Sequence, residues 1–295
     1  MKRTKNFFKV FTPAVTTYLV ASFLVGWALF LMPLLFRSSE GVLPAVVRLI
    51  AWSVAMWAPG LAAMATTAWT EKKPLSTLRL GHLGKPLPYL WAWVVPLILI
   101  LLAAGLTWAA GWGTWDTSMS WLEEQAPELS GTSLLPPGQL IALQIISGLV
   151  VGPLINSLFA VGEEVGWRGF LLPRLLPLGQ TRAILVNGVI WGVWHVPVIA
   201  QGHNYPGHPL LGMGMMVIFT TLLGFLLSWL YFQTRSPWAP AVAHGTVNAA
   251  AALPVLFFDV PDLMLGGTLT SAAGLIILAL FVIFLYLTRQ LPVLS

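Results

Sequence analysis

Eight apolar runs, each of them 20 residues or longer, follow one another along the chain. They cover residues 13–36, 43–69, 87–111, 138–162, 181–200, 209–233, 238–257 and 267–288. A helix of about 20 apolar residues is long enough to cross the hydrocarbon core of a bilayer. The sequence therefore predicts an all-α polytopic membrane protein, a bundle of about eight transmembrane helices that forms a single membrane domain over residues 1–295.

The composition argues against a soluble protein. Only 8% of the residues are charged and 57% are hydrophobic, whereas soluble domains carry about 25% charged residues. The chain has no cysteine, which excludes disulfides, thiolate metal sites and cysteine nucleophiles together. The formal net charge of +5 could suit nucleic acid, but the positions of the basic residues fit a membrane surface instead. We therefore expect no nucleic-acid partner.

Basic and acidic residues fall in different loops of the predicted bundle. With eight spans, both termini and every second loop share one side of the membrane, which then holds Lys2, Arg3, Lys5, Lys9, Lys72, Lys73, Arg79, Lys85, Arg168, Arg174, Arg182, Arg235 and Arg289. The other side holds Arg37 and most of the acids, namely Glu40, Asp116, Glu123, Glu124, Glu128, Asp259 and Asp262. Because cytoplasmic loops carry an excess of Lys and Arg, we predict an integral multi-pass protein of a prokaryotic plasma membrane with both termini in the cytoplasm.

Two adjacent carboxylates, Glu163 and Glu164, directly follow an apolar run that has no charged residue. Ionised acids are costly at membrane depth, so such residues are functional candidates. Glu164 precedes Arg168 by four residues, the favourable order for a helical ion pair, which leaves Glu163 to face a cavity. The alternative is that both acids cap a helix end at the membrane interface. A second acidic pair, at 123–124, lies among polar residues, and we expect it to be solvated on a loop helix.

His195 follows in the next predicted span, and Gly179 is the midpoint between it and Glu163. A hairpin that turns at residues 177–180 would bring Glu163 and His195 to the same height on adjacent antiparallel helices. Small residues four apart permit close approach of two helices, and each of the two helices has such a pair: Gly162 and Gly166 on one, Gly188 and Gly192 on the other. The sequence thus predicts that these two glycine faces meet and that the Glu and the His form a working pair.

His244 and Asn248 are four residues apart and lie on one face of the predicted span 238–257. They offer hydrogen-bond donors within an apolar helix, although such a pair can also simply hold two helices together. The other histidines lie beside Gly and Pro in loops, where we expect them to be solvated: His82, His203 and His208.

These polar groups suit the attack of water on an amide carbonyl. A Glu and a His that share a water form a general-base unit, and a second His with an Asn supplies donors for a developing oxyanion. The sequence has no Gly-x-Ser-x-Gly elbow, no Gly-rich phosphate loop and no His-Glu-x-x-His zinc pattern. We expect no required cofactor, but Glu163, His195 and His244 could ligate zinc or another divalent metal with an open coordination position.

Three short motifs occur in order within these apolar segments: Glu163-Glu164-x-x-x-Arg168, Trp191-x-x-x-His195 and His244-x-x-x-Asn248. In their order, separations and membrane context they resemble the CAAX protease and bacteriocin-processing (CPBP) family of intramembrane endopeptidases. That family usually has Phe at the position of Trp191, which leaves the aromatic role intact. The motifs cover residues 160–250, and the resemblance places the catalytic core at residues 138–257.

The resemblance implies an intramembrane endopeptidase. Glu163 would activate the water with His195, Glu164 would pair with Arg168, and the third motif would polarise the carbonyl or hold its oxyanion. The family is often labelled a metalloprotease, while a metal-free glutamate mechanism is also argued for it. Eukaryotic members cleave prenylated carboxyl-terminal tails, whereas many prokaryotic members are tied to peptide maturation or immunity. We expect a peptide or protein substrate that is presented at or in the lipid bilayer.

Two other classes of protein compete with this interpretation. A transporter could use Glu163, His195 and His244 as a proton or cation relay, but transporters often show two related halves and here the polar residues cluster in the second half only. A catalytically inactive membrane scaffold is the third possibility. A scaffold gains nothing from burying these polar residues, so the protease is the favoured hypothesis.

Overall fold

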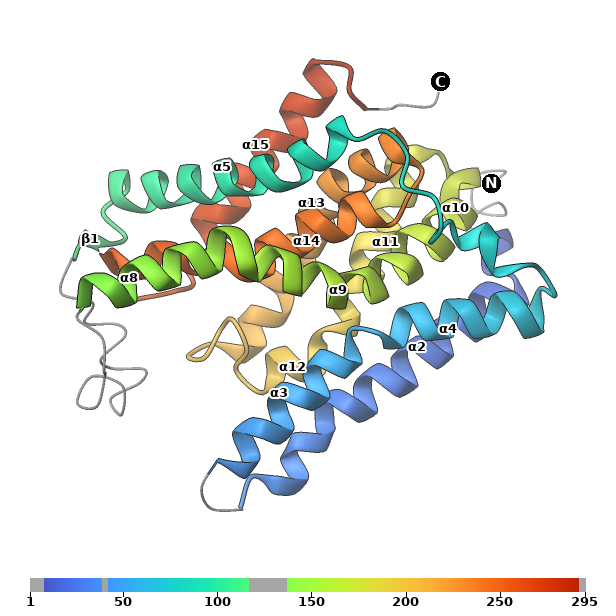
Figure 1. Cartoon of the computed structure of the whole chain (residues 1–295), viewed down its shortest axis with the longest axis horizontal. Coiled ribbons are helices and arrows are strands. Elements are labelled where there is room, and N and C mark those ends of the chain that lie inside the picture. Colours follow the sequence, from blue (N-terminus) through green and yellow to red (C-terminus); the bar gives the residue numbers. More distant parts are fainter. Residues whose placement is uncertain (1–7, 39–41, 117–136, 292–295) are drawn as a thin grey trace.

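The computed structural model describes residues 8–38, 42–116 and 137–291, most of which are helical (Figure 1). Within these residues, six helical stretches are long and apolar enough to cross a membrane: Pro13–Phe36, Leu43–Thr70, Leu87–Ala109, Gln139–Leu178, Pro209–Thr234 and Trp238–Leu256. The predicted all-α membrane fold is confirmed, with a helix count near eight. Outside the described residues lie Lys2, Arg3, Lys5, Glu40 and the predicted loop helix with Glu123, Glu124 and Glu128.

The remaining two predicted spans are shorter helices. The span predicted at 181–200 is broken into α11 (Gln180–Trp194) and α12 (Val196–Ala200), with His195 at the break. Pro197 accounts for the break, because proline has no N–H for the helical hydrogen bond and its ring clashes with the preceding turn. The span predicted at 267–288 is α15 (Ala272–Leu287), which begins at a Ser271 cap and has 16 residues.

The amino-terminal helices form a layer along one side of the molecule (Figure 1). α2 packs against both α3 and α4, and α4 also packs against the segment that carries the two adjacent glutamates. The elements of this layer are α2 (Pro13–Leu31), η1 (Met32–Phe36), α3 (Leu43–Ala55), α4 (Ala58–Ala65), the π-helical turn η2 (Thr66–Thr70) and η3 (Leu75–Leu78).

One helical stretch, Gln139–Leu178, runs for 40 residues. At 1.5 Å per residue it is about 60 Å long, about twice the thickness of the hydrocarbon core, so it is either strongly tilted or extends beyond that core. It begins within α8 (Pro137–Ile146) and continues through η4 (Ser147–Val151), α9 (Gly152–Glu164), η5 (Val165–Leu171), α10 (Leu172–Leu175) and η6 (Leu176–Leu178), of which η4 and η5 are π-helical. The chain then reverses at Gly179, whose φ of 89° favours glycine, as the predicted hairpin requires.

The helix α14 (Trp238–Ala250) lies at the centre of the bundle. It packs most extensively against α9, and also against α5 (Leu87–Ala109) and α13 (Pro209–Thr234). α11 packs along α13, and α15 packs along α5 and α13. As a result, the three helices that carry the sequence motifs, α9, α11 and α14, come together in the interior (Figure 1).

The two ends of the molecule differ in charge. At one end, Arg79, Arg174 and Arg235 from three different segments all lie near the Tyr231 hydroxyl, and the Trp238 indole donates to the Leu80 carbonyl. At the other end, the short antiparallel strands β1 (Thr114–Trp115) and β2 (Phe258–Asp259) pair and join the loops after α5 and α14. These three arginines, which the charge pattern assigns to one side of the membrane, therefore lie at the same end of the molecule.

Candidate active site

The last turn of α9 and the π-helical turn η5 are enclosed on all sides. Every residue from 160 to 172 is buried, and Glu163, Glu164 and Arg168 are 2%, 0% and 0% exposed. Neither carboxylate reaches the surface, so the alternative in which both acids cap a helix end at the membrane interface is wrong. π-Helical turns insert an extra residue into a helix and are frequent at functional sites.

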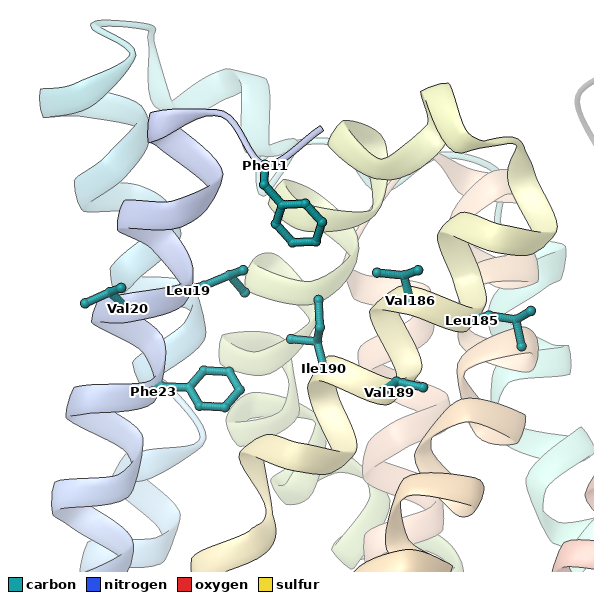
Figure 2. A pocket seen from close by; sticks show the side chains of 8 residues that line it. All are labelled: Phe11, Leu19, Val20, Phe23, Leu185, Val186, Val189 and Ile190. Carbon is teal, nitrogen blue, oxygen red and sulfur yellow. The ribbon is translucent and has the colours of Figure 1, made fainter. Parts of the chain in front are cut away.

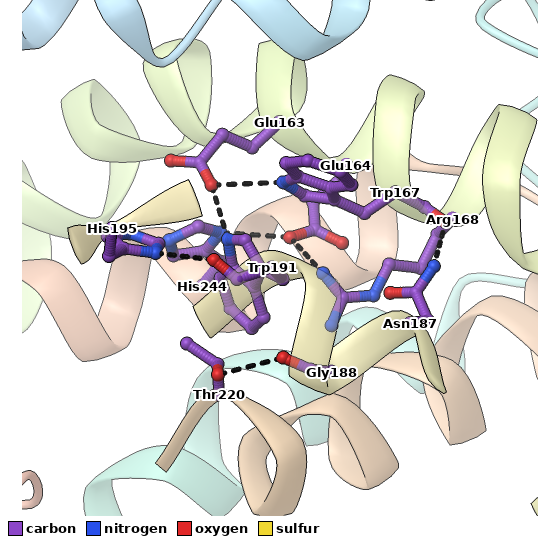
Figure 3. Close-up of polar contacts among 10 residues, drawn as sticks. All are labelled: Glu163, Glu164, Trp167, Arg168, Asn187, Gly188, Trp191, His195, Thr220 and His244. Atoms are coloured by element: carbon purple, nitrogen blue, oxygen red, sulfur yellow. Dashed lines mark hydrogen bonds and ion pairs between the residues drawn. The ribbon is translucent and has the colours of Figure 1, made fainter. Parts of the chain in front are cut away.

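Glu164 bridges two elements of the site (Figure 3). The predicted ion pair is present, with Nη1 of Arg168 donating to Oε1 of Glu164 across 2.9 Å. The same oxygen lies 2.9 Å from Nδ1 of His244 on α14. Because an ionised carboxylate can only accept, Nδ1 of His244 carries a hydrogen and donates it. Glu164 therefore ties η5 to α14 and fixes the orientation of the His244 ring.

Two indoles hold the neighbouring carboxylate, Glu163 (Figure 3). Its Oε2 accepts from Nε1 of Trp191 across 2.6 Å and from Nε1 of Trp167 across 3.2 Å. Among the described residues, none donates a hydrogen bond to its other oxygen, Oε1. The two donors set the direction of the carboxylate without neutralising it, which leaves Glu163 ready to accept a proton.

Trp191 is the side chain around which the site is arranged. Its indole donates to Glu163, and the guanidinium carbon of Arg168 lies 4.5 Å from the centre of its ring. The ring of His244 packs edge-on against it, with centroids 5.2 Å apart. Its backbone carbonyl contacts Nδ1 of His195 across 2.9 Å. Trp191, predicted only as a supporting aromatic residue, thus contacts two residues of the first motif, the histidine of the third motif and the histidine of its own motif.

His195 lies half-buried at the junction of α11 and α12. Since a carbonyl oxygen can only accept, the contact with Trp191 requires a hydrogen on Nδ1 of His195, so Nε2 of the neutral ring has a free lone pair. Among the described residues, no hydrogen bond joins His195 to Glu163. Trp191, one helical turn earlier, reaches the carboxylate instead. The hairpin therefore brings α11 to Glu163, with His195 one turn further along.

Asn248 is exposed and makes no hydrogen bond with the described residues. It lies one turn beyond His244 on the same face of α14. The third motif therefore consists of a buried histidine that is fixed by Glu164 and a more accessible amide next to it, and the two do not bond to each other.

The predicted glycine contact between the two hairpin helices is wrong. A Cβ atom at Gly162 would meet Met56 and Trp57, and one at Gly166 would meet Pro59, so this glycine face packs against the amino-terminal layer at the start of α4. Gly188 and Gly192 instead face α13, where an added Cβ atom would meet Thr221 at Gly188, and Val217 and Thr220 at Gly192. The spacing correctly indicates close helix packing, but spacing alone does not identify the partner helix.

Two residues of the site were not predicted from the sequence. Trp167 donates to Glu163, and the Asn187 side chain donates to the backbone carbonyl of Trp167 across 2.8 Å, in fully buried surroundings. Both have a signal in the sequence. Trp167 follows Glu163 by four residues, and Asn187 is a polar residue one turn before Trp191 and two turns before His195 on α11. A search for polar or indole side chains four residues away from each candidate residue would have identified both.

A metal-binding group is not evident from these positions. Among the described residues, no cluster of three or more His, Cys, Asp or Glu side chains is placed to hold a metal ion. His244 directs Nδ1 to Glu164 and His195 directs Nδ1 to a backbone carbonyl, so Nε2 is the ring nitrogen of each histidine that remains open to a proton or a ligand.

Comparison with known proteins identifies the region that contains these motifs. Residues 139–250 match the family model described as type II CAAX prenyl endopeptidase Rce1-like. The matched region contains all seven predicted site residues and extends from α8 to the end of α14. No curated protein matches the chain. The family match confirms the resemblance drawn from the three motifs and favours the protease over the transporter.

Proposed function

We propose that the chain, a CPBP-type intramembrane protease by its Rce1-like region at residues 139–250, is an endopeptidase in which Glu163 and His195 activate the attacking water. The observation that carries this proposal is the position of Trp191, which holds the Glu163 carboxylate with its indole and the His195 ring with its carbonyl. One rigid residue thus positions two groups that can each accept a proton.

The carbonyl of the scissile bond is bound, in this proposal, by His244 and Asn248. His244 has Nδ1 committed to Glu164, so Nε2 can donate to an oxyanion when the ring is protonated. The Glu164 carboxylate fixes the orientation of that ring, in the way that a carboxylate orients a catalytic histidine. Asn248, exposed and one turn away, supplies a second donor through its amide. Donors that are positioned in advance stabilise the developing charge strongly in a dry site.

Charge balance supports the mechanism. With His244 protonated, the buried cluster contains two carboxylates, Glu163 and Glu164, and two cations, the second being Arg168, so its net charge is zero. When Glu163 takes the proton from water, the negative charge moves from Glu163 to the substrate oxyanion and the net charge is unchanged. Collapse of the intermediate then breaks the C–N bond, and the proton on Glu163 passes to the leaving nitrogen. No uncompensated charge arises in the low-dielectric interior, where one would be costly.

The substrate in this proposal is a peptide or protein segment presented at or in the membrane. The basic loops at one end of the bundle, including Arg79 and Arg235, lead us to place that end and both termini in the cytoplasm of a prokaryotic cell. Single cysteines test the orientation, because the chain has no cysteine of its own. Ser76→Cys should react with an impermeant maleimide only after cell permeabilisation, and Asp259→Cys should react in intact cells. The reverse pattern would invert the topology.

The test of the catalytic assignment is Glu163→Gln. Glutamine keeps the size of the side chain and can still accept the two indole hydrogen bonds, so thermal stability in detergent should be nearly unchanged. Removal of a general base should reduce cleavage of a membrane-peptide library by about 10²-fold or more. Glu71→Gln, a change outside the site, is the matched control and should retain activity. Cleavage by Glu163→Gln at the wild-type rate would show that another group activates the water.

We further propose that the reaction needs no bound metal: Glu163 and His195 can activate a water by proton transfer alone, and among the described residues no group of three or more His, Cys, Asp or Glu side chains is placed to hold an ion. Elemental analysis of active enzyme, followed by exhaustive chelation and add-back of zinc, tests this directly. Activity that survives chelation in protein free of stoichiometric metal is the expected result. Stoichiometric zinc, with activity lost on its removal and restored by its return, would overturn the metal-free mechanism and leave the protease assignment standing.

A further inference from the structure

An apolar groove lies between α2 and α11, on the surface beside the site (Figure 2). Its volume is about 600 Å³, and every residue that lines it is apolar. Phe11, Leu19 and Phe23 line it from the α2 side, and Val186 and Ile190 line it from α11. The volume and the apolar lining of the groove therefore suit a hydrocarbon chain.

Hydrogen bonds close the groove at one end. Past Phe23, the indole of Trp194 donates to the Ser22 carbonyl and the indole of Trp27 donates to the Trp194 carbonyl, which joins α2 to the end of α11. Towards the start of α2 the two helices stand apart (Figure 2). Val20 and Val189, at the edges, are 53% and 44% exposed, so the groove opens sideways, to the surface that faces lipid in a membrane.

A polar pocket of about 380 Å³ adjoins the open end of the groove. Phe11 lines the groove, while its neighbours in sequence, Val10 and Thr12, line the polar pocket. The charged residues of that pocket are Lys9, Glu71 and Arg174. Neighbouring residues of the chain therefore line the apolar groove and the polar pocket, which also contains Arg174 from the end of the bundle where Arg79 and Arg235 lie.

The pocket has an unpaired positive charge. Glu71 already accepts two hydrogen bonds from the Arg174 guanidinium and has Lys73 3.6 Å away, so its charge is more than balanced. Lys9 is exposed and has no ion-pair partner among the described residues. An anionic group placed between Lys9 and Arg174 would meet net positive charge.

We propose that the groove and the polar pocket together bind one anionic phospholipid of the surrounding bilayer. One acyl chain occupies the groove between α2 and α11, and the phosphate lies against Lys9 and Arg174. Basic residues at a membrane surface attract anionic headgroups, and the sideways opening admits a chain from the bilayer. The lipid would fill the space between α2 and the helix that carries Trp191 and His195, and so stabilise α11 without taking part in the reaction.

The test uses native mass spectrometry of the full-length protein in detergent, with phosphatidylglycerol or phosphatidylcholine of identical chains. One phosphatidylglycerol should bind more tightly than phosphatidylcholine. Lys9→Gln should weaken phosphatidylglycerol binding about fivefold, the effect expected from one basic residue at a membrane surface, and leave phosphatidylcholine binding unchanged. Lys85→Gln removes another exposed lysine outside the pocket and should change neither affinity.

A second pair of variants tests the acyl-chain site. Val186→Trp fills the groove and should weaken binding of both lipids, whereas Leu101→Trp, on an exposed part of α5, should not. Equal affinity for the two lipids, or no effect of Lys9→Gln, would overturn the proposal. The proposal would also be overturned if Val186→Trp weakened the binding of a lipidated substrate peptide and left the binding of phosphatidylglycerol unchanged. None of these binding measurements depends on catalysis, so the proposal and the assigned mechanism can fail separately.

Discussion

The buried bridge at Glu164 makes the sharpest prediction about stability. Its Oε1 accepts hydrogen bonds from Arg168 and His244, each across 2.9 Å, and neither Glu164 nor Arg168 is exposed at all. Glu164→Gln keeps the shape and an acceptor oxygen but removes the charge. The guanidinium of Arg168 would then be buried beside a neutral amide, and the charged form of His244 would lose its carboxylate.

The expected magnitude follows from these surroundings. Removing one partner of a buried ion pair costs about 3–5 kcal/mol. Arg168 would retain its contact with the Trp191 ring and the attraction of Glu163, so we expect the lower end, about 3 kcal/mol. In a chain of this size each kcal/mol lowers Tm by about 2–4 °C, so the expected fall is about 6–12 °C. The fluorescence of 15 Trp residues reports unfolding in detergent.

A second Glu–Arg pair in the same chain provides the control. Glu71 also pairs with an arginine, Arg174, but their side chains are 13% and 21% exposed. A pair that water reaches contributes about 1 kcal/mol or less, so Glu71→Gln should lower Tm far less than Glu164→Gln. Adding Arg168→Met to Glu164→Gln should restore part of the lost stability, since no unpaired charge remains. Equal shifts for the two glutamate variants, or no recovery in the double variant, would refute the reasoning.

Three further predictions concern single side chains. Trp191→Phe should lower stability by about 1.5–3 kcal/mol, the contribution of a hydrogen bond to a charged group, and reduce cleavage, whereas Trp27→Phe, which removes an indole donor that does not contact Glu163, should leave kcat/KM unchanged. Asn248→Ala should reduce kcat with no loss of Tm, because the side chain is exposed and unbonded; a large fall in Tm would make it a structural residue instead. Burial opposes ionisation of Glu71, but Arg174 holds the pKa of that carboxyl below its usual value. Wild type should therefore be more stable than Glu71→Gln at neutral pH, and this difference in stability should shrink as the pH falls below about 4. Measuring the Tm of both proteins across this pH range will test it.

The parts of the site that follow from local geometry were predictable from the sequence. The pairing of Glu164 with Arg168 depends only on a four-residue spacing within one helix, and it is present. The turn at Gly179 follows from a Pro- and Gly-containing segment midway between two polar residues. Apolar length likewise predicted the helices, apart from the break at His195, where Pro197 interrupts an otherwise continuous apolar run.

The parts that depend on tertiary packing were not predictable. His244 bonds to Glu164, 80 residues earlier in the chain, whereas the sequence pairs it only with Asn248 on its own helix. The glycine spacings indicate two close helix contacts, but Gly162 meets the start of α4 and Gly188 meets α13. A period in the sequence defines a face of a helix, and the helix that covers this face is decided by the packing of the whole bundle.

Trp191 shows how a departure from a family pattern acquires a physical meaning in the structure. The sequence indicates only that an aromatic ring stands where Phe is usual, and a ring is enough to pack against Arg168 and His244. The indole adds an N–H group, which donates to Glu163 across 2.6 Å. A phenylalanine could reproduce the packing but would leave Trp167 as the one indole donor to that carboxylate among the described residues. The orientation of Glu163 in this protein therefore depends on a hydrogen bond that its own sequence supplies and that the usual residue cannot make.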